Sequence, residues 1–132
     1  MFLVEVNKKR RLLHLSYVGH VQASELRQSR DELNLLMAEL PPGFSLLTDL
    51  SHLESMDVAC ADELAQIMNS CNRKGVEVVV RVVPRPETDI GLNILTVFHY
   101  PRRVQVITCK SLKEGLKMLQ QASVGSAGMI HD

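Results

Sequence analysis

Four side chains that could do chemistry stand close together in the chain, at His52, Glu54, Asp57 and Cys60. Imidazole, carboxylate and thiolate groups bind zinc, and a thiol in the first turn of a helix can gain acidity from the helix dipole. Zinc sites usually show tighter paired spacings such as CxxC or HExxH, and neither is present. We therefore interpret this stretch as a solvated loop, with Cys60 a small apolar filler.

The rest of the sequence offers no stronger catalytic pattern. It contains neither a Ser–His–Asp order nor a glycine-rich phosphate loop. The three cysteines, Cys60, Cys71 and Cys109, form no CxxC pair and are interpreted as free thiols in a reducing cytoplasm. We expect a non-enzymatic, cytoplasmic protein with no metal or other cofactor.

The composition narrows the class of protein further. The chain has 132 residues, of which 45% are apolar and only 4% aromatic, so one domain with an aliphatic core is expected. Fifteen basic residues balance fifteen acidic ones, which argues against a nucleic-acid binder. No apolar run approaches the roughly 20 residues of a membrane span, and the start does not resemble a signal peptide. The basic run at residues 8–11 is interpreted as a solvated turn.

Hydrophobic periodicity predicts the strands and helices that position residues 52–60. Alternation predicts strands at residues 2–6 and 12–18, with Gly19 ending the second. Apolar runs predict strands at 44–48, 76–83 and 104–108. Helical spacing predicts helices over 25–40, from Asp57 to Gly75, over 90–99 after an Asp89 cap, and after Ser111.

This order of elements predicts an α/β fold. The first two strands form an antiparallel hairpin, and alternating helices and strands then give a mostly parallel five-stranded sheet with about four helices. One domain spans residues 1–122. Residues 123–132 have two glycines and no periodic pattern, so a flexible tail that is dispensable for folding is expected.

The same order places a strand end, a loop and a helix N-terminus in one spot. We predict a loop over residues 51–56 and Asp57 as the N-cap of the helix that follows, worth about 1 kcal/mol. The carboxyl ends of parallel strands open at such a spot, which favours a binding site there. Glu63 is expected to point outward from the helix.

The chain resembles the STAS domain, the family of the anti-sigma factor antagonists. The matching residues are Gly19, Asp49-Leu50-Ser51, Met56-Asp57, Leu64, and Gly75 with the strand VEVVVRVV after it. The resemblance implies a small α/β domain with helices mainly on one side of the sheet. It also implies protein–protein signalling rather than chemistry on a substrate.

The resemblance fails at one functional position. Antagonists of this family carry Asp-Ser-Ser-Gly or Asp-Ser-Thr-Gly at the helix start, where a hydroxyl accepts phosphate. Here Val58 and Ala59 follow Asp57, and neither can be phosphorylated. Ser51 and Ser55 are nearby hydroxyls that do not align with the acceptor.

The sequence therefore predicts an interaction module that docks a protein, such as a kinase-like anti-sigma factor. Alternatives are a STAS subunit docked on the ATPase of a membrane lipid-transport complex, and a small-ligand or nucleotide binder that uses the helix N-terminus for an anion. Neither nucleic-acid binding nor membrane insertion is expected, and a homodimer is left open. The predicted partner surface consists of Ser51, His52, Glu54, Met56, Asp57, Val58, Ala59, Cys60, Asp62, Glu63 and Gln66.

Overall fold

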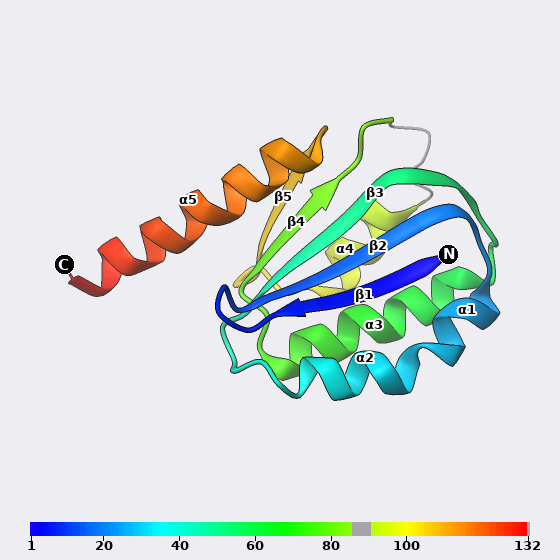
Figure 1. Ribbon diagram of the computed structural model, residues 1–132, viewed down its shortest axis with the longest axis horizontal. Coiled ribbons are helices and arrows are strands. Elements are labelled where there is room, and N and C mark those ends of the chain that lie inside the picture. Colours follow the sequence, from blue (N-terminus) through cyan, green and yellow to red (C-terminus); the bar gives the residue numbers. More distant parts are fainter. Residues whose placement is uncertain (86–90, 132) are drawn as a thin grey trace.

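The chain forms one five-stranded sheet in the order β1-β2-β3-β4-β5 (Figure 1). The computed structural model describes residues 1–85 and 91–131, with side chains as far as residue 122 outside that gap. The strands are β1 Phe2–Asn7, β2 Leu12–Val21, β3 Ser45–Met56, β4 Val78–Val82 and β5 Gln105–Cys109. β1 and β2 pair antiparallel, and the other neighbours pair parallel. The predicted fold class is confirmed.

Within residues 1–85 and 91–131, five helices connect and cover the strands, one more than expected. They are α1 Ala23–Gln28, α2 Arg30–Met37, α3 Cys60–Lys74, α4 Leu92–His99 and α5 Leu112–His131. The extra helix arises because the single helix predicted over residues 25–40 is interrupted at Ser29, whose backbone has φ −86° and ψ −1°. Serine is a weak helix former, and Leu26 of α1 and Leu33 of α2 are both buried in the core on either side of the interruption.

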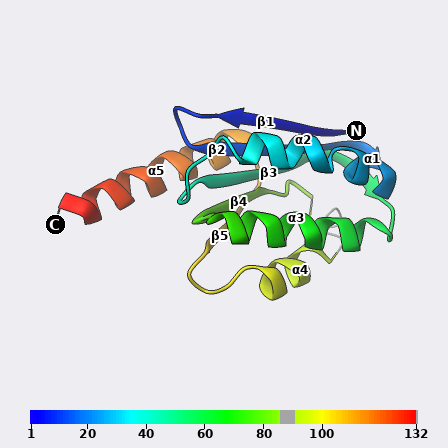
Figure 2. The ribbon, with the colours of Figure 1, turned by 90° about the horizontal axis from the view of Figure 1, so that it is seen from below.

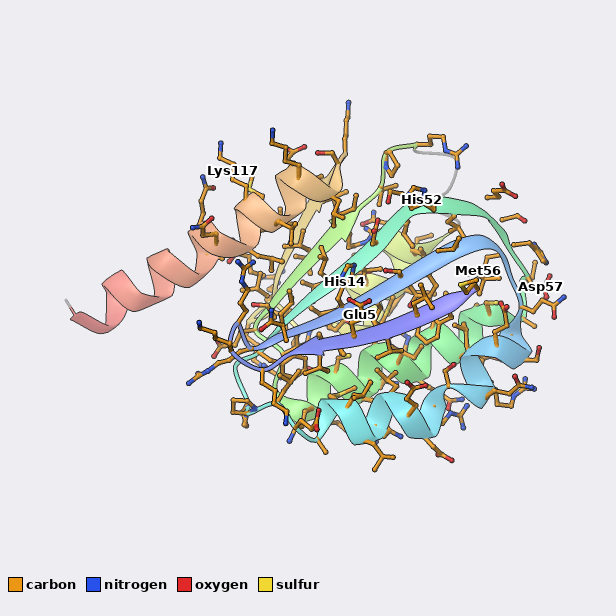
Figure 3. All side chains as sticks on the ribbon, viewed as in Figure 1. Glu5, His14, His52, Met56, Asp57 and Lys117 are labelled. Atoms are coloured by element: carbon orange, nitrogen blue, oxygen red, sulfur yellow. The ribbon has the colours of Figure 1, made fainter. Side chains whose placement is uncertain are left out.

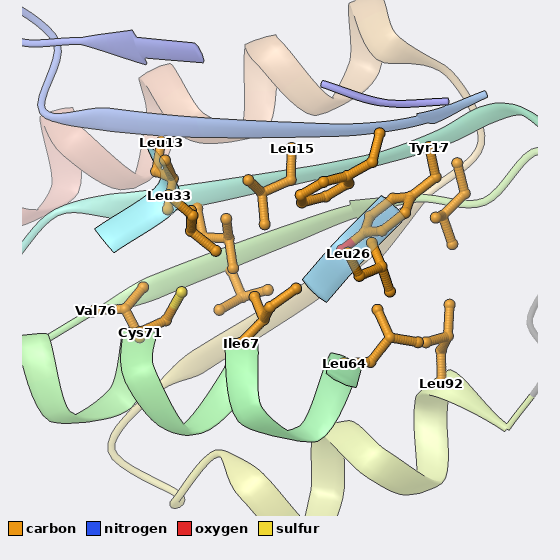
Figure 4. Close-up of a cluster of buried hydrophobic side chains, with 14 of the residues drawn as sticks. Leu13, Leu15, Tyr17, Leu26, Leu33, Leu64, Ile67, Cys71, Val76 and Leu92 are labelled. Carbon is orange, nitrogen blue, oxygen red and sulfur yellow. The ribbon is translucent and has the colours of Figure 1, made fainter. Parts of the chain in front are cut away.

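Helices α1 to α4 cover one face of the sheet, as Figure 2 shows. The main core lies beneath them, where Leu15 and Tyr17 of β2 meet Ile67 and Cys71 of α3 (Figure 4). These four side chains are at most 9% exposed. The expectation of helices mainly on one side is thus confirmed, and this face supports the start of α3.

The other face of the sheet has a smaller core, formed with α5. Leu47, Val80 and Val82 face α5 there and are fully buried. At Gly115 the helix backbone comes so close that an added Cβ would lie 3.0 Å from Val82 Cγ2 and 3.3 Å from Cys109 Sγ. Because helices lie on both sides of it, every residue of β4 is buried, which explains why four of its five residues are valines, with Arg81 the exception.

Two predicted helix ends are confirmed, and a third cannot be compared. Ser111 Oγ accepts a hydrogen bond of 3.1 Å from the Glu114 N–H at the start of α5. Gly75 ends α3 with φ 102°, a left-handed conformation that favours glycine. The predicted cap Asp89 lies outside the described residues.

Helix α5 extends past the predicted domain boundary at residue 122. Its backbone continues to His131, and Figure 1 shows this end leaving the sheet. That residues 123–132 are dispensable for folding stays a prediction.

Candidate functional site

β2 and β3 continue together beyond the end of β4. β4 pairs with β3 only as far as Asp49, whereas β3 runs on beside β2 to Met56. We call this two-stranded part, residues 18–21 and 50–56, the β2–β3 extension. Because the two strands are parallel, their carboxyl ends lie at the same edge of the sheet, where α3 begins.

The predicted loop over residues 51–56 is wrong, because this segment is strand. Two register irregularities disturb the pairing of β2 with β3, so the alternation of apolar and polar residues is lost. Gly19, with φ 68°, lies at the second of them and does not end β2 as predicted. Leu53 anchors the extension as a fully buried side chain, and the Arg85 guanidinium donates a 2.7 Å hydrogen bond to its carbonyl where β4 no longer pairs.

Asp57 is not the N-cap of α3, contrary to the prediction. Helix α3 starts at Cys60, and Ala59 at its N-cap makes no side-chain capping bond. The Asp57 carboxylate lies 3.0 Å from His20 Nε2, and His20 Nδ1 lies 2.6 Å from Ser55 Oγ. Asp57 therefore connects the ends of β2 and β3, while its carbonyl accepts the Cys60 N–H at 2.9 Å.

Replacing Asp57 with alanine is expected to lower the free energy of unfolding by at most about 0.5 kcal/mol. The Asp57 and His20 side chains are 44% and 47% exposed, and exposed ion pairs contribute little. Urea unfolding followed by circular dichroism measures the change. A loss of about 1 kcal/mol or more would show that Asp57 caps α3 after all.

Cys60 is a buried structural thiol. Its side chain is fully buried, and Sγ lies 3.5 Å from the Val21 carbonyl oxygen. Burial, followed by the nearby Asp57 carboxylate, raises the pKa of the thiol. Because a raised pKa leaves less thiolate, the sequence-based interpretation of Cys60 as an apolar filler is supported, and a thiol made more acidic by the helix dipole is not.

The remaining predicted site residues differ in their solvent exposure. Ser51 is half-buried, and its hydroxyl and N–H donate hydrogen bonds of 2.5 Å and 2.9 Å to the Asp49 carboxylate. Met56 is also half-buried and packs against the main core. Figure 3 shows that His52, Met56 and Asp57 lie along the end of β3. The exposed members are His52, Glu54, Asp57, Val58, Ala59, Asp62 and Gln66.

Glu63 points inward, so its predicted outward orientation is wrong. It is 8% exposed, and its two carboxylate oxygens lie 3.2 Å from Arg27 Nε and 2.5 Å from Arg30 Nη2. The hydrogen bond from Arg30, followed by that from Arg27, holds the pKa of this carboxyl below its ordinary value although burial acts in the opposite direction. Glu63 thus joins α3 to α1 and α2, and it is unsuited to a solvent-facing contact.

Sequence reasoning missed an apolar surface on α4. Ile94, Val97 and Phe98 are 63%, 71% and 79% exposed. Leu92 of the same helix is buried, so apolar residues occupy both its inner and outer faces. The signal was present in the sequence, because the run ILTVF has more apolar residues than one face of a short helix can bury.

Neither a metal site nor a membrane span is found in the part of the chain that the structure describes. There, no three side chains of His, Cys, Asp or Glu come together as a metal site would require. No described helix combines the length and apolar character needed to cross a bilayer.

No protein-family model matches this chain, and no curated protein matches it. Several solved structures, however, are similar to it. A DUF3478-family protein from Shewanella loihica PV-4, described as having a SpoIIAA-like fold, superposes with a TM-score of 0.67 at 14% identity, over 90% of this chain and 92% of that one. The anti-sigma factor antagonist SpoIIAA in its unphosphorylated form gives 0.62 at 12% identity, over 91% and 98%. The Bacillus cell fate determinant SpoIIAA in its phosphorylated form gives 0.62 at 12% identity, over 90% and 99%.

These likenesses establish the fold. The chain has the SpoIIAA-like arrangement over nearly its whole length, which confirms the STAS-like fold inferred from the sequence.

Proposed function

We propose that this chain is a non-enzymatic, cytoplasmic binding module that docks a protein partner around the start of α3. The observation that carries the proposal is Val58, whose side chain is 89% exposed directly before that helix. A valine so exposed contributes little to the stability of the fold. At an interface, by contrast, each Å² of its apolar surface removed from water contributes about 25 cal/mol.

The fold neighbours support a function of the anti-sigma factor antagonist kind. SpoIIAA is named as such an antagonist, and it has been solved with and without phosphate. In this chain Val58 and Ala59 lack a hydroxyl, so partner binding is not controlled by phosphate at these positions. The hydroxyl of Ser55 lies against His20, and that of Ser51 donates to Asp49.

Acidic side chains surround Val58 in the sequence and favour a partner with basic groups. Glu54, Asp57 and Asp62 lie within four residues of Val58, and all three are exposed. Charges at the rim of an interface mainly set the rate of association. A partner with an apolar pocket and basic residues around it would fit this surface.

Replacing Val58 with lysine is expected to weaken capture of the partner at least about tenfold, because it puts a charge into an apolar contact. The wild-type protein and the variant are immobilised, and captured proteins are quantified by mass spectrometry. Leu35→Lys on α2 is the matched control, since Leu35 is also a strongly exposed apolar residue, at 73%. The control is expected to capture the partner as the wild type does.

Two results would contradict the proposal. One is equal capture by wild type and Val58→Lys. The other is capture that survives Val58→Lys but is lost with Phe98→Lys, which would move the site to the apolar surface of α4. The identity of the captured protein separates an anti-sigma factor from the ATPase of a membrane transporter.

A further inference from the structure

A groove of about 380 Å³ lies between α2 and α3. Its floor is apolar, formed by Leu26, Leu33 and Ile67, which are at most 9% exposed. The volume falls within the range of roughly 300–1,000 Å³ that is usual for ligand pockets. The groove can therefore receive several side chains of a bound segment.

Polar side chains form the walls of this groove. They are Arg30 and Asn34 of α2, and Glu63, Gln66, Asn69, Ser70 and Arg73 of α3. Amide side chains carry both donors and acceptors, so they can hydrogen-bond to the backbone of a segment that lies along the groove.

The charges on the walls leave an excess of positive charge. Among the described lining residues Glu63 is the one carboxylate, and both of its oxygens already contact arginines, Arg27 and Arg30. A guanidinium has five N–H donors, so Arg30 retains donors after it binds Glu63. Arg73 makes one long contact, of 3.4 Å, to the Ser70 hydroxyl. Asp62 is near on α3 but does not line the groove.

We propose that this groove binds a short acidic segment of the protein partner. Apolar side chains of the segment lie on the floor, and a neighbouring aspartate or glutamate contacts Arg73 and the remaining donors of Arg30. Arginine forms paired hydrogen bonds with carboxylates, which favours this chemistry over that of a neutral segment. The inference rests on the proposed function: it adds an acidic segment to a partner whose basic groups face the start of α3.

Selection of peptides on the full-length protein tests the inference. Random 12-residue peptides displayed on phage are selected on the immobilised protein, and the enriched peptides are synthesised. Enrichment of Asp or Glu next to apolar residues is expected. Binding of these peptides is expected to weaken at least about tenfold with Arg73→Glu, and to shift backbone amide signals of α2 and α3 in NMR spectra.

Lys117→Glu is the matched control, since it makes the same charge change on α5, at the other face of the sheet (Figure 3). It is expected to leave peptide affinity unchanged. Circular dichroism checks that Arg73→Glu folds, and Arg73→Gln serves as a milder variant if it does not.

The inference is overturned if no peptide is enriched, if the enriched peptides have no acidic excess, or if Arg73→Glu binds them as the wild type does. This outcome differs from failure of the proposed function. Val58→Lys leaves the groove intact, so it is expected to lose the partner while it still binds the peptides.

Discussion

Replacing Glu63 with arginine is expected to lower the free energy of unfolding by about 3 kcal/mol. The change removes a carboxylate that is 8% exposed and places a third guanidinium beside Arg27 and Arg30. Breaking a buried ion pair costs about 3–5 kcal/mol, and the lower end applies here because both arginines are partly exposed. Urea unfolding measures the loss.

Asp62→Arg makes the same charge change one residue earlier and is the control. Asp62 is exposed and is expected to tolerate the change within about 0.5 kcal/mol. If both variants unfold at the wild-type midpoint, the contact between Glu63 and the two arginines does not hold α3 to α1 and α2.

Acid should weaken the same contact. The hydrogen bonds from Arg30 and Arg27 lower the pKa of Glu63 in the folded protein below its ordinary value of 4.5. A lowered folded-state pKa gives a stability contribution that is present above the ordinary value and is lost as the pH falls through the lowered one. The stability difference between wild type and Glu63→Gln is therefore expected to be constant near neutral pH and to shrink below about pH 4.5.

Replacing Gly115 with leucine is expected to cost about 2–3 kcal/mol of stability. Even a Cβ at this position would lie 3.0 Å from Val82 Cγ2, so the larger side chain must push α5 away from β4. Overpacking of this kind costs about 1–3 kcal/mol, and displacing α5 also uncovers apolar side chains of β4. Helix propensity acts in the opposite direction, by up to about 1 kcal/mol.

A lower thermal midpoint for Gly115→Leu would show that overpacking outweighs the gain in helix propensity. Lys117→Leu introduces the same side chain at an exposed position of α5 and is expected to change the midpoint little. A higher midpoint for Gly115→Leu would mean that α5 does not pack closely on β4 at this residue.

The fold was predictable because its signals are local and mutually consistent. Alternation in β1 and β2, the valine-rich run of β4 and the Ser111 and Gly75 helix ends each indicate one structure without help from distant residues. The interruption at Ser29 was missed because one weak helix former does not outweigh the periodicity around it.

The candidate site was harder to predict, because contacts distant in sequence decide it. Residues 51–56 are strand because β2 supplies their hydrogen-bonding partners, and the irregularities in register remove the alternation that would reveal a strand. Asp57 contacts His20 and Glu63 contacts Arg27, over 37 and 36 positions respectively. Its charge favours an outward orientation for Glu63, but it lies three residues after buried Cys60 and four before buried Ile67, at the edge of the buried stripe of α3. There the two arginines pair with its carboxylate.

The position of α5 also matters for synthesis of the chain on the ribosome. The strands emerge before the 20 residues of α5, and at about 5–20 residues per second those residues take roughly one to four seconds to be added. During that time Val80 and Val82 have no cover on the α5 side of the sheet. Once it has left the ribosome, β4 exposes a β-branched run of valines, with Arg81 among them, until α5 covers it, and exposed segments of this kind promote aggregation.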